Sequence, residues 1–231
     1  KKNLIKLNLP AIAFKTFTVQ YERVLAGKSS LALTLSVSPN ATLPFKKTLM
    51  DAFSDNADAK KAIESTLYTR YTANLEYRLY LSKQGAPKGF YIAPFVRYMQ
   101  MELNQDYPFT PSDGTQHVAN LKSKFSAFGG GLMFGAQWLL GEHMALDWWI
   151  IGGFYGSNIN ADFIGTDPKM NTMTQQDRDD LKEDIESFDI PGYTIKATVP
   201  PVGSPSNTVT ANLEGPYYGI RGFGICLAYR F

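Results

Sequence analysis

The chain has 231 residues, of which 44% are hydrophobic, 13% are aromatic and 19 are glycine. This composition is more typical of strands and turns than of helices, and the length suits one large domain or two small ones. A net charge of +2 without a basic stretch argues against nucleic acid as a partner. The single cysteine, Cys226, excludes an intramolecular disulfide and a cysteine-based metal site. The first residue, Lys1, follows no apolar leader, as expected of a mature exported protein or of a trimmed chain.

Alternation of apolar residues with polar or small ones is the dominant pattern along the chain. Between Arg70 and Leu81, for example, the odd positions carry only Tyr, Ala and Leu, while most even positions are polar. A period of two predicts a strand with one apolar and one polar face. Eight such strands are predicted, over Asn3–Ile12, Thr16–Leu25, Leu31–Val37, Arg70–Leu81, Gly89–Asn104, Leu121–Leu140, Met144–Ile159 and Gly215–Phe231.

One uncharged stretch, Phe125–Gly141, is long enough to be tested as a membrane helix. It contains five glycines, each of which costs about 1 kcal/mol in a helix interior. Its residues also alternate rather than follow a helical period. We therefore predict a strand here and no membrane-spanning helix.

The predicted connections fall into two classes by length. The short ones are Ala26–Ser29, Ser82–Lys88 and Gly141–His143, and the first hairpin, near Phe14 and Lys15, is also short. The long ones cover residues 38–69, 105–120 and 160–214. Within them, Lys46–Thr66 and Thr174–Phe188 are predicted to be helical, the second with a capping-box-like start at Thr174 and Asp177. Pro191–Asn212, rich in Pro, Gly, Ser and Thr, is predicted to be irregular.

The two faces of these strands carry different kinds of side chain, and the difference indicates whether each face contacts lipid, water or the barrel interior. The apolar faces are crowded with large side chains, and an interior enclosed by eight strands has room only for side chains of moderate size. Alternation places Phe154 on the apolar face, with Leu146, Trp148 and Ile150, and Cys226 on the polar face. The polar faces carry Lys6, Asn8, Gln20, Glu22, Asn74, Glu76, Arg78, Arg97, Gln137, Asp147 and Arg230, and the glycines Gly129, Gly131, Gly135, Gly222 and Gly224.

These glycines suit a tight interior that must admit Arg and Glu side chains. The chain is therefore predicted to be a single all-β domain, residues 1–231, that forms an eight-stranded antiparallel transmembrane barrel with its apolar face toward lipid. A soluble barrel is the alternative. Short turns on one end and long, helix-bearing loops on the other are the layout of outer-membrane barrels.

The charges on the polar face are of both signs, which predicts that they pair inside the barrel. Glu22 and Glu76 are expected to neutralise Arg78 and Arg97, because buried charges without partners are costly. A structural salt-bridge network is expected from Glu22, Glu76, Arg78, Arg97 and Asp147. It would close the lumen, and an ion or proton path is the alternative.

The end of the chain carries a resemblance to known proteins. Phe223, Ile225, Leu227, Tyr229 and Phe231 alternate up to the last residue, which resembles the C-terminal signal that outer-membrane proteins present to the barrel-assembly machinery. The runs Val19–Leu25, Thr72–Leu81 and Gly89–Tyr98 resemble a family of small outer-membrane barrels of unknown function from Bacteroidota, akin to the eight-stranded OmpX and OmpA. The resemblance implies the fold and a location in the bacterial outer membrane. It covers the strands, not the long loops, and implies no catalytic residues.

Candidate catalytic and metal-binding residues are few. His117 and His143 are expected at opposite ends of one strand, so they cannot share a site, and a single loop histidine such as His117 is expected to be solvated. The acidic residues of the Thr174–Phe188 helix match no calcium-loop spacing and are expected to form a solvated face. No catalytic, metal or cofactor site is predicted, and the protein is not expected to be an enzyme.

Three functions stay open at this point. The first is a structural or partner-binding barrel whose long outer loops dock another protein or a larger outer-membrane complex, since loops on a rigid scaffold carry recognition. The second is a lipid A-modifying enzyme acting through His117. The third is a small-solute channel. Membrane lipid, lipopolysaccharide and the assembly machinery are the expected partners, and nucleic acid is not.

Overall fold

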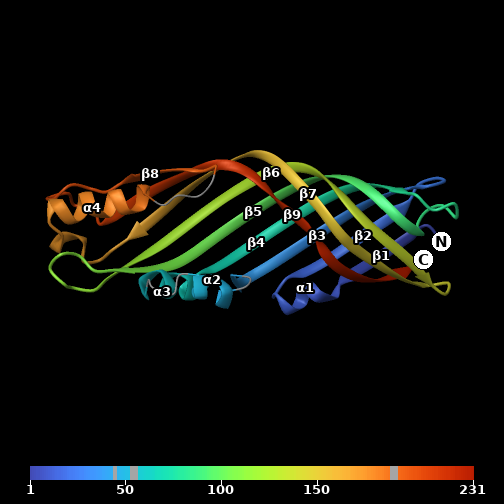
Figure 1. Ribbon diagram of the computed structural model, residues 1–231, viewed down its shortest axis with the longest axis horizontal. Coiled ribbons are helices and arrows are strands. Elements are labelled where there is room, and N and C mark those ends of the chain that lie inside the picture. Colours follow the sequence, from blue (N-terminus) through green and yellow to red (C-terminus); the bar gives the residue numbers. More distant parts are fainter. Residues whose placement is uncertain (44–45, 53–56, 188–191) are drawn as a thin grey trace.

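The computed structural model of the chain describes residues 1–43, 46–52, 57–187 and 192–231 (Figure 1). The strands are β1 (Asn3–Asn8), β2 (Phe17–Val24), β3 (Ser29–Thr42), β4 (Leu67–Tyr80), β5 (Gly89–Phe109), β6 (His117–Leu140), β7 (Met144–Thr166), β8 (Thr194–Thr198) and β9 (Thr208–Arg230). The helices are α1 (Leu9–Ala13), α2 (Lys46–Ala52), α3 (Ala57–Ser65) and α4 (Gln175–Glu186), with a 3-10 turn at Met170–Thr172.

All nine strands belong to one antiparallel sheet, so the predicted all-β class is confirmed. Eight of them, β1 to β7 and β9, follow one another around a ring that closes where β1 pairs with β9. The ninth, β8, pairs with residues 210–214 of β9. The prediction of an irregular segment over Pro191–Asn212 was therefore wrong for β8 and for the start of β9, while Pro191 lies outside the described residues. β8 has five residues, too few for a clear alternation in the sequence, and it is stabilised by its pairing with β9.

Four strands continue well beyond the ring. β5, β6, β7 and β9 have 21 to 24 residues each, and their far halves form, with β8, what we call the outer extension. The chain termini and the short turns lie at the opposite end of the molecule from α2, α3 and α4 (Figure 1). Much of the ranges expected as long loops, residues 105–120 and 160–214, is thus strand.

The first predicted strand is shorter than expected, because it gives way to a helix at Asn8. The Asn8 side chain accepts a hydrogen bond from the backbone N–H of Ala11 (3.3 Å), and Pro10 lies in the first helical turn. Both features favour a helix start. The five residues of α1, Leu9–Ala13, are all apolar, so their pattern did not distinguish a helix from a strand.

The helices at the end away from the chain termini, α2, α3 and α4, lie where helices were predicted, as far as they are described. Lys46–Thr66 contains α2 and α3, with residues 53–56 outside the described part. α4 begins with the predicted capping box of Thr174 and Asp177, and Phe188 lies beyond the described residues. The uncharged stretch Phe125–Gly141 lies almost wholly in β6, as predicted. In the described parts of the chain, no helix is long and apolar enough to cross a membrane.

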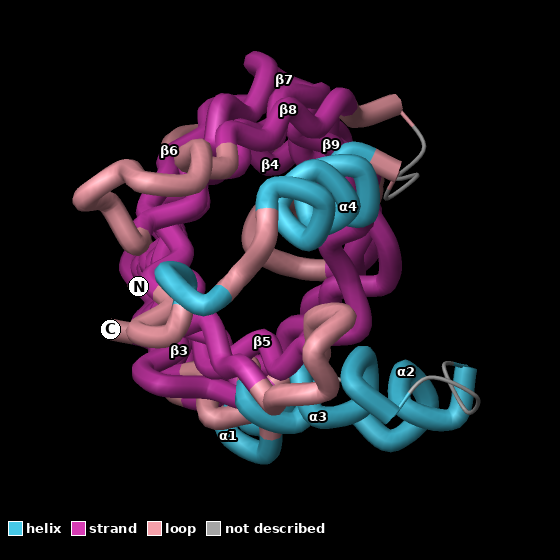
Figure 2. Tube along the Cα trace, turned by 90° about the vertical axis from the view of Figure 1, so that its left-hand side faces the viewer, coloured by secondary structure: helices cyan, strands magenta, loops and turns pink. Residues whose placement is uncertain are grey.

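The ring has its apolar side chains on the outside and its charged ones on the inside. Leu33, Leu75 and Leu132 lie on the outer face and are each 43% exposed. Lys6 and Glu22, by contrast, are fully buried within the ring. Figure 2, a view along the ring, shows the strands around its outline, with α4 inside that outline and α2 and α3 outside it.

In β7 and β9 the alternation of inward and outward side chains shifts by one residue part-way along the strand. The prediction that Phe154 faces outward was therefore wrong. In β7, Trp149 pairs with Gly135 and Ile151 with Phe134, so Ile150 is an extra residue in the ladder. Beyond it the alternation is reversed, and Phe154, expected outside, lies inside against Tyr217, with ring centroids 4.9 Å apart. β9 changes phase in the same region, where Phe223 has a φ of +58°. Such bulges turn side chains to the opposite face.

Candidate functional site

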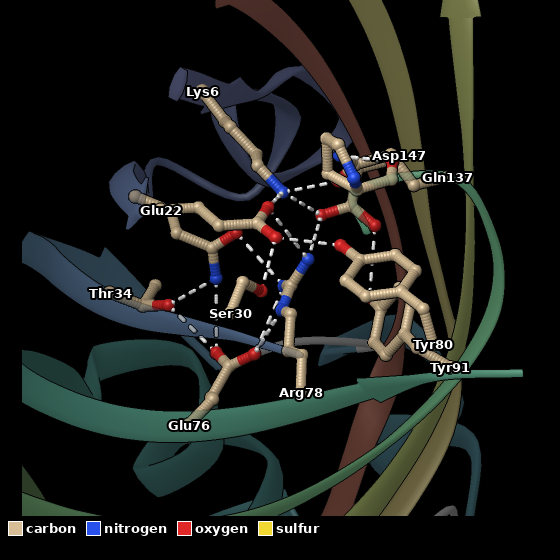
Figure 3. Close-up of polar contacts among 12 residues, drawn as sticks. Lys6, Glu22, Ser30, Thr34, Glu76, Arg78, Tyr80, Tyr91, Gln137 and Asp147 are labelled. Atoms are coloured by element: carbon tan, nitrogen blue, oxygen red, sulfur yellow. Dashed lines mark hydrogen bonds and ion pairs between the residues drawn. The ribbon is translucent and has the colours of Figure 1, made fainter. Parts of the chain in front are cut away.

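The most developed polar site is a network of buried side chains inside the ring (Figure 3). Every ring strand supplies at least one member, and most are less than 2% exposed. The members, from β1 to β9, are Lys6, Gln20, Glu22, Ser30, Thr34, Glu76, Arg78, Tyr80, Tyr91, Gln137, Asp147 and Arg221.

Glu76 lies on one side of this network and has both oxygens satisfied. Its Oε2 accepts from Nε and Nη2 of Arg78, at 3.1 and 3.0 Å. Its Oε1 accepts from Arg221 Nη2 (2.5 Å), Thr34 Oγ1 (2.9 Å) and Gln20 Nε2 (3.0 Å). Glu76 thus links β2, β3, β4 and β9.

Glu22 and Asp147 hold the other side around Lys6. Lys6 Nζ contacts both carboxylates and also donates to Gln137 Oε1 at 2.6 Å. Tyr80 donates its hydroxyl proton to Glu22 (2.7 Å), and Tyr91 donates its own to Asp147 (2.8 Å). These bonds join β1 and β2 to β4, β5, β6 and β7.

Arg78 lies between the two sides and connects them. Its Nη1 donates to Asp147 at 2.7 Å, its Nη2 donates to Gln20 at 2.9 Å, and its guanidinium carbon lies 4.4 Å from the Tyr91 ring centroid. The three cations Lys6, Arg78 and Arg221 face the three carboxylates Glu22, Glu76 and Asp147, so the network is balanced in charge. Buried ion pairs depend on good geometry and on additional hydrogen bonds to offset the loss of hydration.

Four of the five residues predicted to form a salt-bridge network are brought together here: Glu22, Glu76, Arg78 and Asp147. The fifth, Arg97, lies apart, and its partners are neutral, Tyr217 Oη at 2.7 Å and Asn74 Oδ1 at 3.1 Å. Its predicted pairing with a glutamate was wrong, because the carboxylates of Glu22 and Glu76 are held by Lys6, Arg78 and Arg221.

Two charged members, Lys6 and Arg221, were not among the predicted site residues. Lys6 was assigned to the polar face but not to the network. Arg221 was not assigned to that face at all, since it has the same parity as the outward-facing Phe223. The phase change at Phe223 turns Arg221 inward, and a positive φ at a non-glycine residue leaves no signal in the sequence.

The inner-face glycines were expected to make room for Arg and Glu side chains, but two of them, Gly135 and Gly224, make room for aromatic rings. A Cβ at Gly135 would lie 2.3 Å from the Tyr91 ring, and one at Gly224 would lie 2.6 Å from the Trp149 ring. Both rings hold Asp147, since Trp149 Nε1 also donates to it (3.2 Å). The glycines therefore support the network indirectly.

In the outer extension, His117 is fully buried rather than solvated as expected. Its Nδ1 lies 2.5 Å from Asp167 Oδ2, and its Nε2 lies 3.0 Å from Thr115 Oγ1. That hydroxyl donates its proton to Asp113 (2.7 Å), so the imidazole is the donor to Thr115. The arrangement ties the start of β6 to the segment after β7.

The helix α4 is fastened to the extension through two residues that were expected on a solvated face. Arg178 is 1% exposed and donates to the carbonyls of Met170 (2.7 Å) and Pro200 (2.5 Å). Asp177 accepts from the backbone N–H of Ser112 (2.9 Å) and from Thr174, and these bonds hold the pKa of its carboxyl well below the ordinary range. Among the described residues, no cluster of three or more His, Cys, Asp or Glu could hold a metal ion.

Between α4 and the inner face of the extension lies an apolar pocket of about 300 Å³. Its walls come from β5, β6, β7, β8, β9 and α4, and they include Phe109, Leu121, Phe163, Leu181, Ile185 and Ile195. Asp184 of α4 also lines the pocket, and the exposed Asp180 lies with Asp184 around a neighbouring hollow.

Comparison with known proteins gives one match, to a family described as a protein of unknown function, DUF3575, over residues 1–178. The chain belongs to this family. The DUF3575 match runs from β1 into α4, and so covers seven strands of the ring but not β9. No curated protein and no solved structure matched the chain. The expectation of a family of unknown function is thereby confirmed, without bearing on OmpX or OmpA.

Proposed function

We propose that this protein is an outer-membrane β-barrel that is closed inside and binds a partner protein through its outer extension. The observation that carries the proposal is a change of polarity along the outward face of single strands. On β6, the outward Phe128, Leu132 and Phe134 are 43% to 54% exposed and apolar. Farther along the same face lie the exposed Lys122 and Lys124. A strand in one solvent has no reason to change in this way.

The neighbouring strands change at the same level. On β5, the outward Val96 and Tyr98 are followed by Glu102 and Asn104, and Lys124 on β6 bonds Glu102 at 2.7 Å. The level is marked by outward aromatic side chains on adjacent strands, namely Tyr71, Tyr98, Phe128, Tyr155 and Tyr218. Aromatic girdles of this kind flank the apolar band of membrane barrels.

A second group of outward aromatic residues lies near the chain termini, including Phe90, Trp138, Trp148 and Tyr229. The ten residue steps from Phe128 to Trp138 correspond to about 33 Å along a strand. A strand tilted by about 40° spans about 25 Å of height over that length, which matches the apolar band of outer-membrane barrels. The termini would then face the periplasm and the outer extension would face outward.

The interior supports a structural barrel rather than a channel. The network around Arg78 joins all eight ring strands and leaves its carboxylates and cations paired. Conductance across a planar bilayer should therefore be absent. The outward alternation of Phe223 to Phe231, at 40% to 73% exposure, suits recognition by the assembly machinery.

The extension supplies the chemistry of a binding surface. Its apolar pocket would take a hydrophobic side chain, and the carboxylates of Asp180 and Asp184 at the pocket would pair with basic residues of the partner. The expected partner is thus a protein segment with an apolar anchor flanked by Lys or Arg. No observation favours the lipid A-modifying alternative, since His117 is engaged in a structural clamp.

Membrane insertion is tested by fractionation and gel migration. We expect the chain in outer-membrane fractions, migrating without boiling as a compact species that shifts on heating. Recovery in the soluble fraction, or migration unchanged by heating, would contradict the barrel.

Partner binding is tested separately with charge-reversed variants. The double variant Asp180→Lys and Asp184→Lys should lose proteins that co-purify with the wild type, while Glu214→Lys, an exposed change elsewhere on the extension, should retain them. Salt should weaken the association. A wild-type protein that purifies alone, or equal capture by all variants, would refute the docking role and leave the barrel untouched.

A further inference from the structure

A second cavity, of about 340 Å³, lies inside the ring next to the ion-pair network, on the side away from the chain termini. Three arginines line it, Arg70 on β4, Arg97 on β5 and Arg221 on β9. Hydroxyl groups of Thr16, Thr18, Ser36 and Thr72 lie around them. None of its described lining residues is an acid. We refer to this space as the arginine cavity.

Arg221, which lines the arginine cavity, has one hydrogen-bond donor that is not used. Its side chain is 7% exposed, and its Nη2 is held by Glu76. Its Nη1 is buried and has no hydrogen-bond partner among the described residues. The guanidinium also lies 4.8 Å from the Trp149 ring centroid, which fixes its plane. Buried donors left unpaired are rare and costly in native proteins.

Arg97 brings a charge that no acid among the described residues neutralises. Its two hydrogen-bond acceptors, Tyr217 and Asn74, are neutral, and its guanidinium lies 5.2 Å from the Phe154 ring centroid. The neighbouring ion-pair network has three cations for three carboxylates, so it has no excess negative charge that could neutralise Arg97. Arg70, which lies 5.6 Å from the Tyr68 ring centroid, adds a further cation.

We propose that the arginine cavity binds one small oxyanion, a phosphate or carboxylate group. Guanidinium groups bind such oxygens through paired N–H donors, and the surrounding hydroxyls can donate to the remaining ones. The anion would neutralise Arg97 and would lie beside Arg221, whose Nη1 has no acceptor among the described residues. This inference goes beyond the partner-binding role and does not depend on the outer extension.

The anion has two possible sources, a free solute or the headgroup of a lipid. On the side where β9 pairs with β1 and β8, those pairings cover residues 226–230 and 210–214. The stretch Gly215–Ile225 has no strand partner there in the described chain, and Ile220 on it, 73% exposed, also lines the arginine cavity. A lipid headgroup could therefore enter sideways as well as a solute from the outer end.

Binding is measured on the purified, folded protein with arginine side-chain NMR signals. In phosphatidylcholine vesicles, inorganic phosphate should shift the Arg97 and Arg221 signals saturably if the source is a free anion. A shift that instead requires phosphatidic acid in the vesicles identifies a headgroup. Both outcomes support the site, and no saturable shift with either probe overturns it.

Two variants separate a built site from an adventitious one. Arg97→Gln should weaken binding by at least tenfold, while Arg23→Gln, an exposed arginine on β2, should leave it unchanged. Asn74→Asp is nearly isosteric and gives Arg97 its own carboxylate, so it should fold and also lose binding. Equal binding by Asn74→Asp and the wild type would refute the proposal, even if Arg97→Gln fails to fold.

Discussion

The ring and the outer extension are built from the same strands but have opposite polarity. In the ring, β5 and β6 turn Val96 and Leu132 outward, while the interior holds Arg78 and its partners. In the extension, the same two strands turn Glu102 and Lys124 outward, while Phe109 and Leu121 line an apolar pocket. Strand pairing is continuous across the change. The face of each strand that is apolar therefore changes along the strand, although the backbone pairing does not.

The two interiors are also stabilised in different ways. The extension has an ordinary apolar cluster in which Met170, Met173 and Val209 pack with Leu181 and Ile185 of α4. Such a cluster tolerates the loss of one contact. The ion-pair network of the ring depends on the pairing of its charges, because the loss of one partner leaves a buried charge uncompensated.

The largest effect is expected from removing the central cation of the ring. Arg78→Met leaves Glu22, Glu76 and Asp147 facing only two cations, and breaking a buried pair in this way costs about 3–5 kcal/mol. The free energy of unfolding, measured by urea titration in lipid vesicles, should fall by that amount. Arg23→Met, at an exposed site, should change it by no more than about 0.5 kcal/mol.

A charge on the outer face of the ring should cost less, and its cost should depend on depth. Leu132→Arg places a cation in the middle of the apolar band, where the penalty is about 2–4 kcal/mol. Ser126→Arg lies on the same face of β6, beyond Phe128, where the penalty is about 0–1 kcal/mol. Equal penalties at the two positions would contradict a boundary between them.

In the extension, the His117 clamp should have a smaller and local effect. His117→Ala leaves the carboxylate of Asp167, which is 1% exposed, without its nearest partner, and such a loss costs about 1–3 kcal/mol. Proteolysis of the extension should become faster while gel migration of the ring is unchanged. Mass spectrometry should show the same lipid A as in the wild type, whereas an altered profile would revive the enzyme hypothesis.

The smallest effect is expected at the α4 cap and depends on pH. Because hydrogen bonds from Ser112 and Thr174 lower the pKa of Asp177 below its ordinary value of 3.8, its contribution is present above that value and is lost as the pH falls below it. Asp177→Asn should speed cleavage of α4 at neutral pH and remove this acid-dependent step. A wild type whose α4 is equally protected below pH 3.8 would contradict the assignment.

The sequence predicted the ring far better than the extension, for a physical reason. In the ring, strict alternation reported the strands and the faces of Glu22, Glu76, Arg78 and Asp147. A bulge cannot be seen in the alternation of the sequence, so the inward orientation of the Phe154 and Arg221 side chains was not predicted. Arg97 was on the expected face, but its partners depend on which carboxylates other cations already hold.

The extension was missed because its polarity is reversed. Residues near Asp106 and Asn120 alternate with polar side chains outward, and next to a hydrophobic strand they resemble a loop. The start of α4 was predicted because its capping box is local to Thr174 and Asp177. His117 and Asp167 are 50 residues apart, and only the fold brings them together.

The polarity boundary on β6 is tested most directly by labelling single cysteines along its outward face in lipid vesicles. With Cys226 replaced by Ala, cysteines at Lys122, Lys124, Ser126, Phe128, Leu132 and Phe134 are exposed in turn to a membrane-impermeant maleimide. We predict rapid labelling at Lys122 and Lys124 and protection from Phe128 to Phe134. Uniform labelling along the whole face would contradict the membrane barrel.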